Sequence, residues 1–151
     1  MKPTGYKTVI VTSPAAIVDN AAFTTNVIDT KGFSFAEIFV MLGELDIAVA
    51  ALKVRESDSS DMSGAADITG TVFGTNNNDT GSASTLPADD ADNTLYKFEI
   101  DLKGRKRYLD LSITGGNGAA GTYAAAWANL HEGDNVPATA AQKGIAQLMR
   151  A

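Results

Sequence analysis

Acidic residues are the first side chains in this sequence that could do chemistry. Five aspartates gather in two polar segments: Asp58, Asp61, Asp89, Asp90 and Asp92. Their carboxylates could bind calcium, because this hard cation prefers oxygen ligands. Neither segment has the spacing of an EF-hand loop, so turn formation and solubility explain these residues better. We therefore expect no metal site and keep a calcium-binding loop as the open alternative.

A pair of carboxylates could also hydrolyse a glycosidic bond. The candidates are Glu37, Glu44, Glu99 and Asp101. Glu99 and Asp101 are expected on the same wet strand face as Lys97 and Lys103, because strand residues two apart share a face. Ion pairing between these side chains explains the carboxylates without catalysis.

The single histidine, His131, could serve as a catalytic base or a metal ligand. Spacing alone allows a Ser-His-Asp triad around it, but the Gly-x-Ser-x-Gly motif of a nucleophile elbow is missing. One histidine cannot form a multi-histidine metal site, and there is no cysteine to add a thiolate. We expect an ordinary polar residue at a strand end and no catalytic residue.

The segment from Gly116 to Gly121 matches the dinucleotide-binding pattern Gly-x-Gly-x-x-Gly. That motif needs a following helix and then a second parallel strand ending in an acidic residue. Too little chain follows, and no strand is evident after His131. We expect a glycine-rich connection between two strands, and no cofactor.

The one basic cluster is Lys103-Gly-Arg-Lys-Arg107. In an acidic protein, cations concentrated at a turn could meet an acidic surface of a partner protein. Nucleic-acid binding is disfavoured, because aromatic stacking residues other than Tyr108 are missing nearby. A turn whose charges are simply solvated is the open alternative.

Composition indicates one ordinary globular domain. The chain has 151 residues, 44% hydrophobic and 20% charged, which is enough to bury a core without disulfides. A net charge of −6 disfavours binding to a phosphate backbone. The apolar patch from Val9 to Val11 is too short for a signal peptide, and no run reaches the length of a membrane span. We expect a chain used without secretion, with neither nucleic acid nor membrane as partner.

Two strands with strict alternation of apolar and polar residues must position these groups. Tyr96, Phe98, Ile100 and Leu102 alternate with charged residues, and Leu109, Leu111 and Ile113 repeat the pattern after the basic turn. The pattern predicts an antiparallel hairpin over residues 95–114, with one dry and one wet face.

Further strands are expected on both sides of this segment. The expected ranges are 6–11, 15–18, 25–29, 33–42, 47–55, 68–73 and 122–131. Residues 33–42 are apolar on both faces, which indicates a strand covered on both sides. Alanines leave a helix open for residues 122–131, but Tyr123, Trp127 and the flanking glycines favour a strand. The long polar segment from Gly74 to Asn93 is either a functional loop or local disorder.

The C-terminal segment differs in kind. Thr139 and Gln142 have the spacing of a capping box, and one helical face would then carry Ala141, Ile145, Leu148 and Met149. The pattern predicts a short helix or arm, weakened by Gly144. It could dock on its own sheet or reach a neighbouring subunit.

Three segments resemble small structural proteins of tailed bacteriophages. They are residues 95–111, 51–58 and 140–144, and the similarity covers most of residues 23–145. In that group the gene lies beside the gene of the major capsid protein. The nearest described relatives are capsid cement, or decoration, proteins with a jelly-roll β-sandwich. The resemblance implies a structural protein on the virion surface, made in the host bacterial cytoplasm.

The resemblance also implies the partners. A cement protein binds the major capsid protein and bridges its subunits, and it forms homo-oligomers to span a local symmetry axis, with a dimer ahead of a trimer. The expected contacts are the N-terminal arm, the loop from Gly74 to Asn93, the basic tip and the tail. Their residues include Arg105, Lys106, Arg107, Ile145, Leu148 and Met149.

Together these patterns predict a single all-β domain, a jelly-roll-like antiparallel sandwich of about eight strands with a short C-terminal helix or arm. Residues 1–22 would form an arm and first strand, 23–136 the sandwich and 137–151 the tail. The expected function is capsid stabilisation without chemistry. The alternative is a carbohydrate-binding or adhesin-type module, which needs exposed aromatic residues beside a groove. Trp127 lies among alanines and is expected to be buried, which disfavours that alternative.

Overall fold

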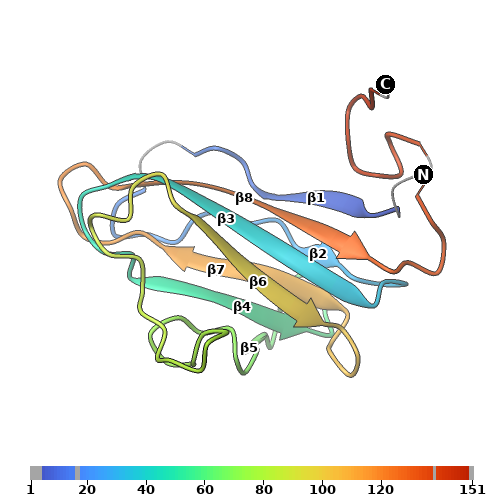
Figure 1. The fold of residues 1–151 in the computed structure, drawn as a ribbon, viewed down its shortest axis with the longest axis horizontal. Coiled ribbons are helices and arrows are strands. Elements are labelled where there is room, and N and C mark those ends of the chain that lie inside the picture. The colour runs from blue at the N-terminus through green and yellow to red at the C-terminus, as the bar shows by residue number, and fades with distance from the viewer. Residues whose placement is uncertain (1–4, 16–17, 138, 150–151) are drawn as a thin grey trace.

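The fold, seen in a computed structural model, is described for residues 5–15, 18–137 and 139–149. Two antiparallel sheets of four strands pack face to face (Figure 1). The first sheet has the order β1-β8-β3-β6, with β1 at Lys7–Thr12, β8 at Thr122–His131, β3 at Phe35–Leu45 and β6 at Leu95–Asp101. The second has the order β2-β7-β4-β5, with β2 at Ile28–Asp29, β7 at Tyr108–Thr114, β4 at Ala51–Ser57 and β5 at Ala66–Asp67.

Successive strands alternate between the two sheets, except that β4 and β5 are neighbours in the same sheet. This winding is that of a double-sheet jelly roll, in which eight strands form two Greek keys. The predicted all-β, jelly-roll-like sandwich is confirmed.

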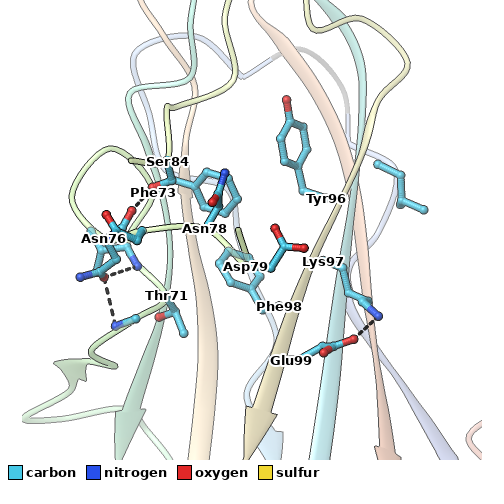
Figure 2. A pocket seen from close by; sticks show the side chains of 14 residues that line it. Thr71, Phe73, Asn76, Asn78, Asp79, Ser84, Tyr96, Lys97, Phe98 and Glu99 are labelled. Atoms are coloured by element: carbon cyan, nitrogen blue, oxygen red, sulfur yellow. Dashed lines mark hydrogen bonds and ion pairs between the residues drawn. The ribbon is translucent and has the colours of Figure 1, made fainter. Parts of the chain in front are cut away.

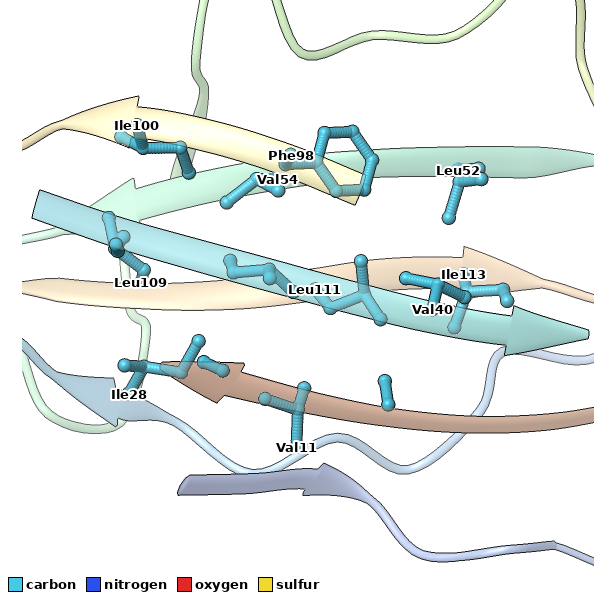
Figure 3. Packing of buried hydrophobic residues seen from close by; sticks show 14 of the residues in the cluster. Val11, Ile28, Val40, Leu52, Val54, Phe98, Ile100, Leu109, Leu111 and Ile113 are labelled. Carbon is cyan, nitrogen blue, oxygen red and sulfur yellow. The ribbon is translucent and has the colours of Figure 1, made fainter. Parts of the chain in front are cut away.

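The core lies between the two sheets and follows from the alternation along each strand. In β3, for example, Ala36, Ile38, Val40 and Leu42 are all buried. Figure 3 shows side chains of one sheet interleaved with those of the other, among them Val40, Phe98, Ile100, Val54, Leu109 and Leu111. β8 is a strand over the whole predicted range, since it hydrogen-bonds to both β1 and β3. Pairing on both sides outweighs the helix propensity of its alanines.

The predicted hairpin over residues 95–114 is wrong, although both of its strands exist. β6 pairs with β3 in the first sheet, and β7 pairs with β4 and β2 in the second. The connecting residues cross from one sheet to the other, and Gly104 takes a positive φ of 77° on the way. Alternation specifies which face of each strand is dry, but two dry faces can also meet across a sandwich.

Two shorter predicted strands, over residues 15–18 and 68–73, are not seen as strands in the residues that the structure describes. Residues 16 and 17 lie outside the described residues, and Val18 makes only an isolated bridge to Thr122. The fifth strand ends before Ile68, although Ile68 and Phe73 still donate backbone hydrogen bonds to the edge of β4, at Val54 and Leu52. The described residues of both segments hydrogen-bond to neighbouring strands at separate positions.

The predicted C-terminal helix is also wrong in the described part of the tail. The capping box forms, because the backbone N–H of Gln142 donates to Thr139 Oγ1 at 3.2 Å and that of Thr139 to Gln142 Oε1 at 3.1 Å. Gly144 then adopts a φ of 69°, and the N–H of Ile145 donates to the carbonyl of Ala140, as in a Schellman motif. The capping box that would start a helix and the Schellman motif that ends one thus lie within a single turn.

This turn lies against the first strand. The backbone N–H of Thr8 donates to the carbonyl oxygen of Lys143 at 2.8 Å. A Cβ atom at Gly144 would lie 1.9 Å from the carbonyl oxygen of Thr8, so only glycine permits the approach. The tail therefore docks on its own sheet at this point. In the described ranges no helix has the length and apolar character to span a membrane.

Candidate interaction surface

The outer side of the first sheet carries apolar side chains that nothing in the described chain covers. The expectation that β3 is covered on both sides is therefore wrong. Six residues form what we call the outer apolar face: Ile10, Phe39, Met41, Leu95, Tyr123 and Trp127. Ile10, Met41, Leu95 and Tyr123 are 56%, 47%, 57% and 36% exposed, respectively.

The strand register brings these residues together. Ile10 lies opposite Trp127, and Trp127 lies opposite Phe39. In the next row Met41 lies between Ala125 and Leu95. Directly opposed side chains on one sheet face touch, so the six residues form one patch across four strands.

Trp127 is half-buried, so the expectation that it is buried is wrong. Its ring stacks on Phe39, with ring centroids 5.3 Å apart and an interplanar angle of 11°. The alanines beside it in the sequence face the core, because alternate residues of a strand point to opposite sides. Neighbours in the sequence therefore do not indicate whether this tryptophan is buried.

The other end of the same sheet face is polar and centres on Glu37. His131 Nε2 lies 2.8 Å from Glu37 Oε2, and Lys97 Nζ lies 3.3 Å from Glu37 Oε1. Burial acts to raise the pKa of Glu37, but the hydrogen bonds from His131 and Lys97 outweigh it and hold that pKa below its ordinary value. Glu99, directly opposite Glu37, also pairs with Lys97.

This network bears on the predicted chemistry. A glycosidase needs one carboxyl group with a raised pKa to act as general acid, and the pKa of Glu37 is shifted in the opposite direction. In the described chain His131 hydrogen-bonds to Glu37 and contacts the rings of Tyr6 and Phe35, and no serine hydroxyl is hydrogen-bonded to it. Its surroundings are those of a polar residue at a strand end.

A groove runs between β6 and the loop that follows β5. Its volume is about 560 Å³. Phe73, Tyr96 and Phe98 form an aromatic cluster at its wall, with Phe73 edge-on to the other two rings at 5.6 and 5.5 Å. Figure 2 shows Asp79 extending from the loop toward β6, beside Tyr96. Within the described chain, the Asp79 carboxylate and the Tyr96 hydroxyl have no hydrogen-bond partner.

Three cations of the basic cluster, Arg105, Lys106 and Arg107, form the basic tip and are paired within the molecule. Arg107 makes two hydrogen bonds to Asp29, at 2.8 and 2.7 Å, and lies over the ring of Tyr108. Arg105 pairs with Glu56 at 3.5 Å, and Lys106 with Asp58 at 3.3 Å. The three side chains lie close together, but their charges are largely balanced by the protein itself.

The apolar residues of the tail do not share a helical face. Ile145 is half-buried, whereas Leu148 is 36% and Met149 88% exposed. They lie near the start of β1 rather than near the basic tip, since the tail turn docks at Thr8. Contacts with a capsid or a second subunit stay predictions for both groups.

The glycine-rich segment after β7 is a connection to β8, as predicted. Gly116 packs against the carbonyl oxygen of Ala48, and the N–H of Gly118 donates to Asp19 Oδ1 at 3.1 Å. No helix follows it in the described chain. Nowhere in the described part of the chain do three His, Asp or Glu side chains lie close enough together to hold a metal ion.

The outer apolar face is the site that sequence reasoning missed. Residues 33–42 are apolar on both faces, which is the pattern that could have indicated this site. The same pattern is found in a strand covered on both faces by its own chain and in a strand with one exposed apolar face. Comparisons with protein-family models, with curated proteins and with solved structures returned no match.

Proposed function

We propose that this protein is a structural virion protein that binds the outer surface of a phage capsid and stabilises it by bridging major capsid protein subunits. The observation that carries the proposal is the outer apolar face, which the described chain leaves uncovered. Exposed apolar patches that span several strands are typical of protein interaction sites. Burying the face against another protein would remove it from water.

Several features support a shell as the partner surface. A cement protein needs a rigid scaffold with an adhesive face, and the jelly roll supplies both. Many copies on symmetry-related positions would gain strength through multivalency, so a modest patch per copy is sufficient. The resemblance of residues 51–58, 95–111 and 140–144 to phage cement proteins nominates the major capsid protein.

Co-sedimentation with capsids that lack the protein tests the proposal. Compact precursor shells and expanded shells are compared over a range of protein concentrations. We expect saturable binding at a fixed ratio to capsid subunits, stronger on the expanded shells. Absence of binding to both forms would overturn the capsid proposal.

Substitutions on the two sheets test which face binds. We expect Ile10→Ser combined with Met41→Ser to abolish sedimentation with shells, because polar side chains make the face unfit for apolar burial. Lys53→Ala, on the outer side of the second sheet, is the matched control and should bind like the unmodified chain. Equal binding by all three proteins would show that another surface makes the contact.

A second candidate function, a carbohydrate-binding or adhesin-type module, is favoured by the groove beside β6. Tyr96 supplies a half-buried aromatic ring, and Asp79 supplies a carboxylate that could accept hydrogen bonds from sugar hydroxyls. Such sites combine an apolar wall with a few polar groups that fix the ligand's orientation.

A glycan array with the purified protein tests this candidate. Binding should be lost in Tyr96→Ala and kept in Tyr123→Ala, because Tyr123 lies outside the groove. Glycan binding that depends on Tyr96, together with no binding to either capsid form, would favour the second candidate over the first.

A further inference from the structure

β6 leaves one edge of the first sheet open in the described chain. It is seven residues long and lies at the end of the order β1-β8-β3-β6. The N–H of Leu42 donates to the carbonyl of Thr94 at 2.9 Å. Hydrogen bonding alternates along an antiparallel ladder, so the even-numbered residues of β6 direct their backbone N–H and C=O groups toward β3. The odd-numbered residues turn their N–H and C=O groups to the open side: Leu95, Lys97, Glu99 and Asp101.

The other three sheet edges are protected. β2 and β5 are only two residues long. Along β1, the N–H of Thr8 donates to Lys143 and the carbonyl of Val11 accepts from the N–H of Asn26 at 2.7 Å. Proteins commonly shorten or cover their edge strands, because open edges pair with other chains. Among the described strands, β6 alone presents a long edge ready for pairing.

A groove lies beside this edge. The loop that follows β5 contacts β6 through Phe73, which packs on Tyr96 and Phe98, and the groove of about 560 Å³ described above lies between the loop and the strand. Figure 2 shows Asn78 and Asp79 of the loop on one side of this groove and Tyr96 and Lys97 of β6 on the other.

The charges of β6 are complementary to those of a second β6. Lys97 and Glu99 are exposed on the outer side of the strand, where they pair with each other within one copy, and Lys97 also pairs with Glu37. If two copies pair antiparallel about a twofold axis at Phe98, each Lys97 lies directly opposite Glu99 of the other copy. A twofold axis at Lys97 or at Glu99 would also pair residues whose backbone groups point to the open edge. Such an axis, however, places two lysines or two glutamates directly opposite each other. Opposed unlike charges stabilise a strand pair and like charges destabilise it.

We propose that two copies of this protein associate edge to edge through antiparallel pairing of their β6 strands, with the twofold axis at Phe98. Lys97 pairs with Glu99 of the second copy, and Leu95 with Asp101. Each of these pairs exchanges two backbone N–H···O bonds. The contact is isologous, as expected for a twofold dimer.

This pairing has a consequence for the rest of the surface. The two first sheets join into one continuous sheet, and a twofold axis perpendicular to it turns both outer apolar faces to the same side. The dimer thus presents a doubled apolar surface, with Leu95 of each copy near its centre. A glycan in the groove would compete with the second strand. The inference does not rest on the proposed function, because it is tested without a capsid.

Charge reversal tests the pairing. Lys97→Glu places glutamates opposite each other, and Glu99→Lys places lysines opposite each other. We expect either change to raise the dimer dissociation constant by about tenfold or more, measured by sedimentation velocity over a concentration series. Lys97→Glu combined with Glu99→Lys in one chain should restore the dimer. Mixing the two single variants should produce a heterodimer, since both contacts are then complementary.

Lys53→Glu, on the second sheet, is the control and should leave the dimer unchanged. Circular dichroism of every variant checks that the fold is kept. A wild-type chain that sediments as a monomer at every concentration overturns the proposal. Single variants that dimerise as well as the wild type, or a mixture that forms no heterodimer, overturn it equally.

Discussion

The outer face of the second sheet is closed by its own ion pairs, whereas that of the first sheet carries aromatic and aliphatic side chains. On the second sheet Arg55 makes two hydrogen bonds to Asp110, at 3.0 and 2.5 Å. Lys53 pairs with Asp67 at 2.9 Å, next to Arg55 on the same strand. On the first sheet the corresponding central position holds Trp127 stacked on a phenylalanine.

This difference shows that charged and apolar sheet faces are stabilised in different ways. A charged face can be satisfied by the chain itself, because oppositely charged side chains on neighbouring strands reach each other. An apolar face is satisfied only when a surface covers it and excludes water. The described chain has no third layer, so the apolar face of the first sheet stays in contact with water.

The largest expected effect separates the inner and outer faces of β8. Leu130→Ala empties a fully buried position and should lower the free energy of unfolding by about 3 kcal/mol. Trp127→Ala removes a larger side chain from the outer face, but its ring is only half-buried, so we expect a smaller loss of about 2 kcal/mol from the lost stacking and partial burial. Urea denaturation of both variants measures the difference. A greater loss for Trp127→Ala would mean that the outer face belongs to the folding core.

The second effect concerns the charged face. Asp110→Asn removes the charge that Arg55 faces, and the side chain of Asp110 is 7% exposed. We expect a loss of about 2 kcal/mol, because charge-assisted bonds of a buried carboxylate contribute strongly. Asp67→Asn is the control at a 43% exposed position and should cost about 0.5 kcal/mol or less. Equal losses would show that burial of this pair has no influence.

The third effect is the pH dependence of one ion pair on the charged sheet. The hydrogen bonds from Arg107 hold the pKa of Asp29 below its ordinary value of 3.8. The contribution of this pair is therefore fully present above pH 3.8 and is lost as the pH falls through the lower, folded-state pKa. Asp29→Asn should have a lower urea midpoint than the wild type at pH 7. At pH 3 the difference between the two midpoints should be smaller. A constant difference at both pH values would contradict the assignment.

The smallest effect on stability is expected on the apolar face. Ile10→Thr and Met41→Thr should each change the free energy of unfolding by about 0.5 kcal/mol or less, because both side chains are largely exposed. Retention on a hydrophobic-interaction column should fall clearly for both variants. Lys53→Thr provides the comparison and should not reduce retention. Unchanged retention for Ile10→Thr would place the adhesive surface elsewhere.

Much of the fold could be predicted because strand alternation is a local property. The dry faces of β6 and β7 were assigned correctly from their sequence pattern, whereas the two-sided burial expected for β3 and the burial expected for Trp127 in β8 were wrong. The pairing partners of the strands could not be predicted in this way, because strand pairing depends on residues far apart in the chain. The turn at Arg105–Arg107 therefore looked like a hairpin tip, while its strands belong to different sheets.

The candidate site was harder to predict for a related reason. Arg107 and Lys106 formed a conspicuous basic cluster, but Asp29 and Asp58, distant in the sequence, neutralise them. Ile10, Met41 and Trp127 were inconspicuous, because each is one apolar residue in a different strand. Only the register between strands joins them.

By itself, the sequence determined that this chain is an all-β sandwich with a turn-rich surface, because side-chain periodicity and turn residues act over a few neighbours. The tertiary structure alone decided which strands share a sheet, that the tail stops after one turn against Thr8, and that β6 keeps an open edge. Those outcomes depend on contacts between segments far apart in the chain. Such contacts exist only once the whole chain has folded.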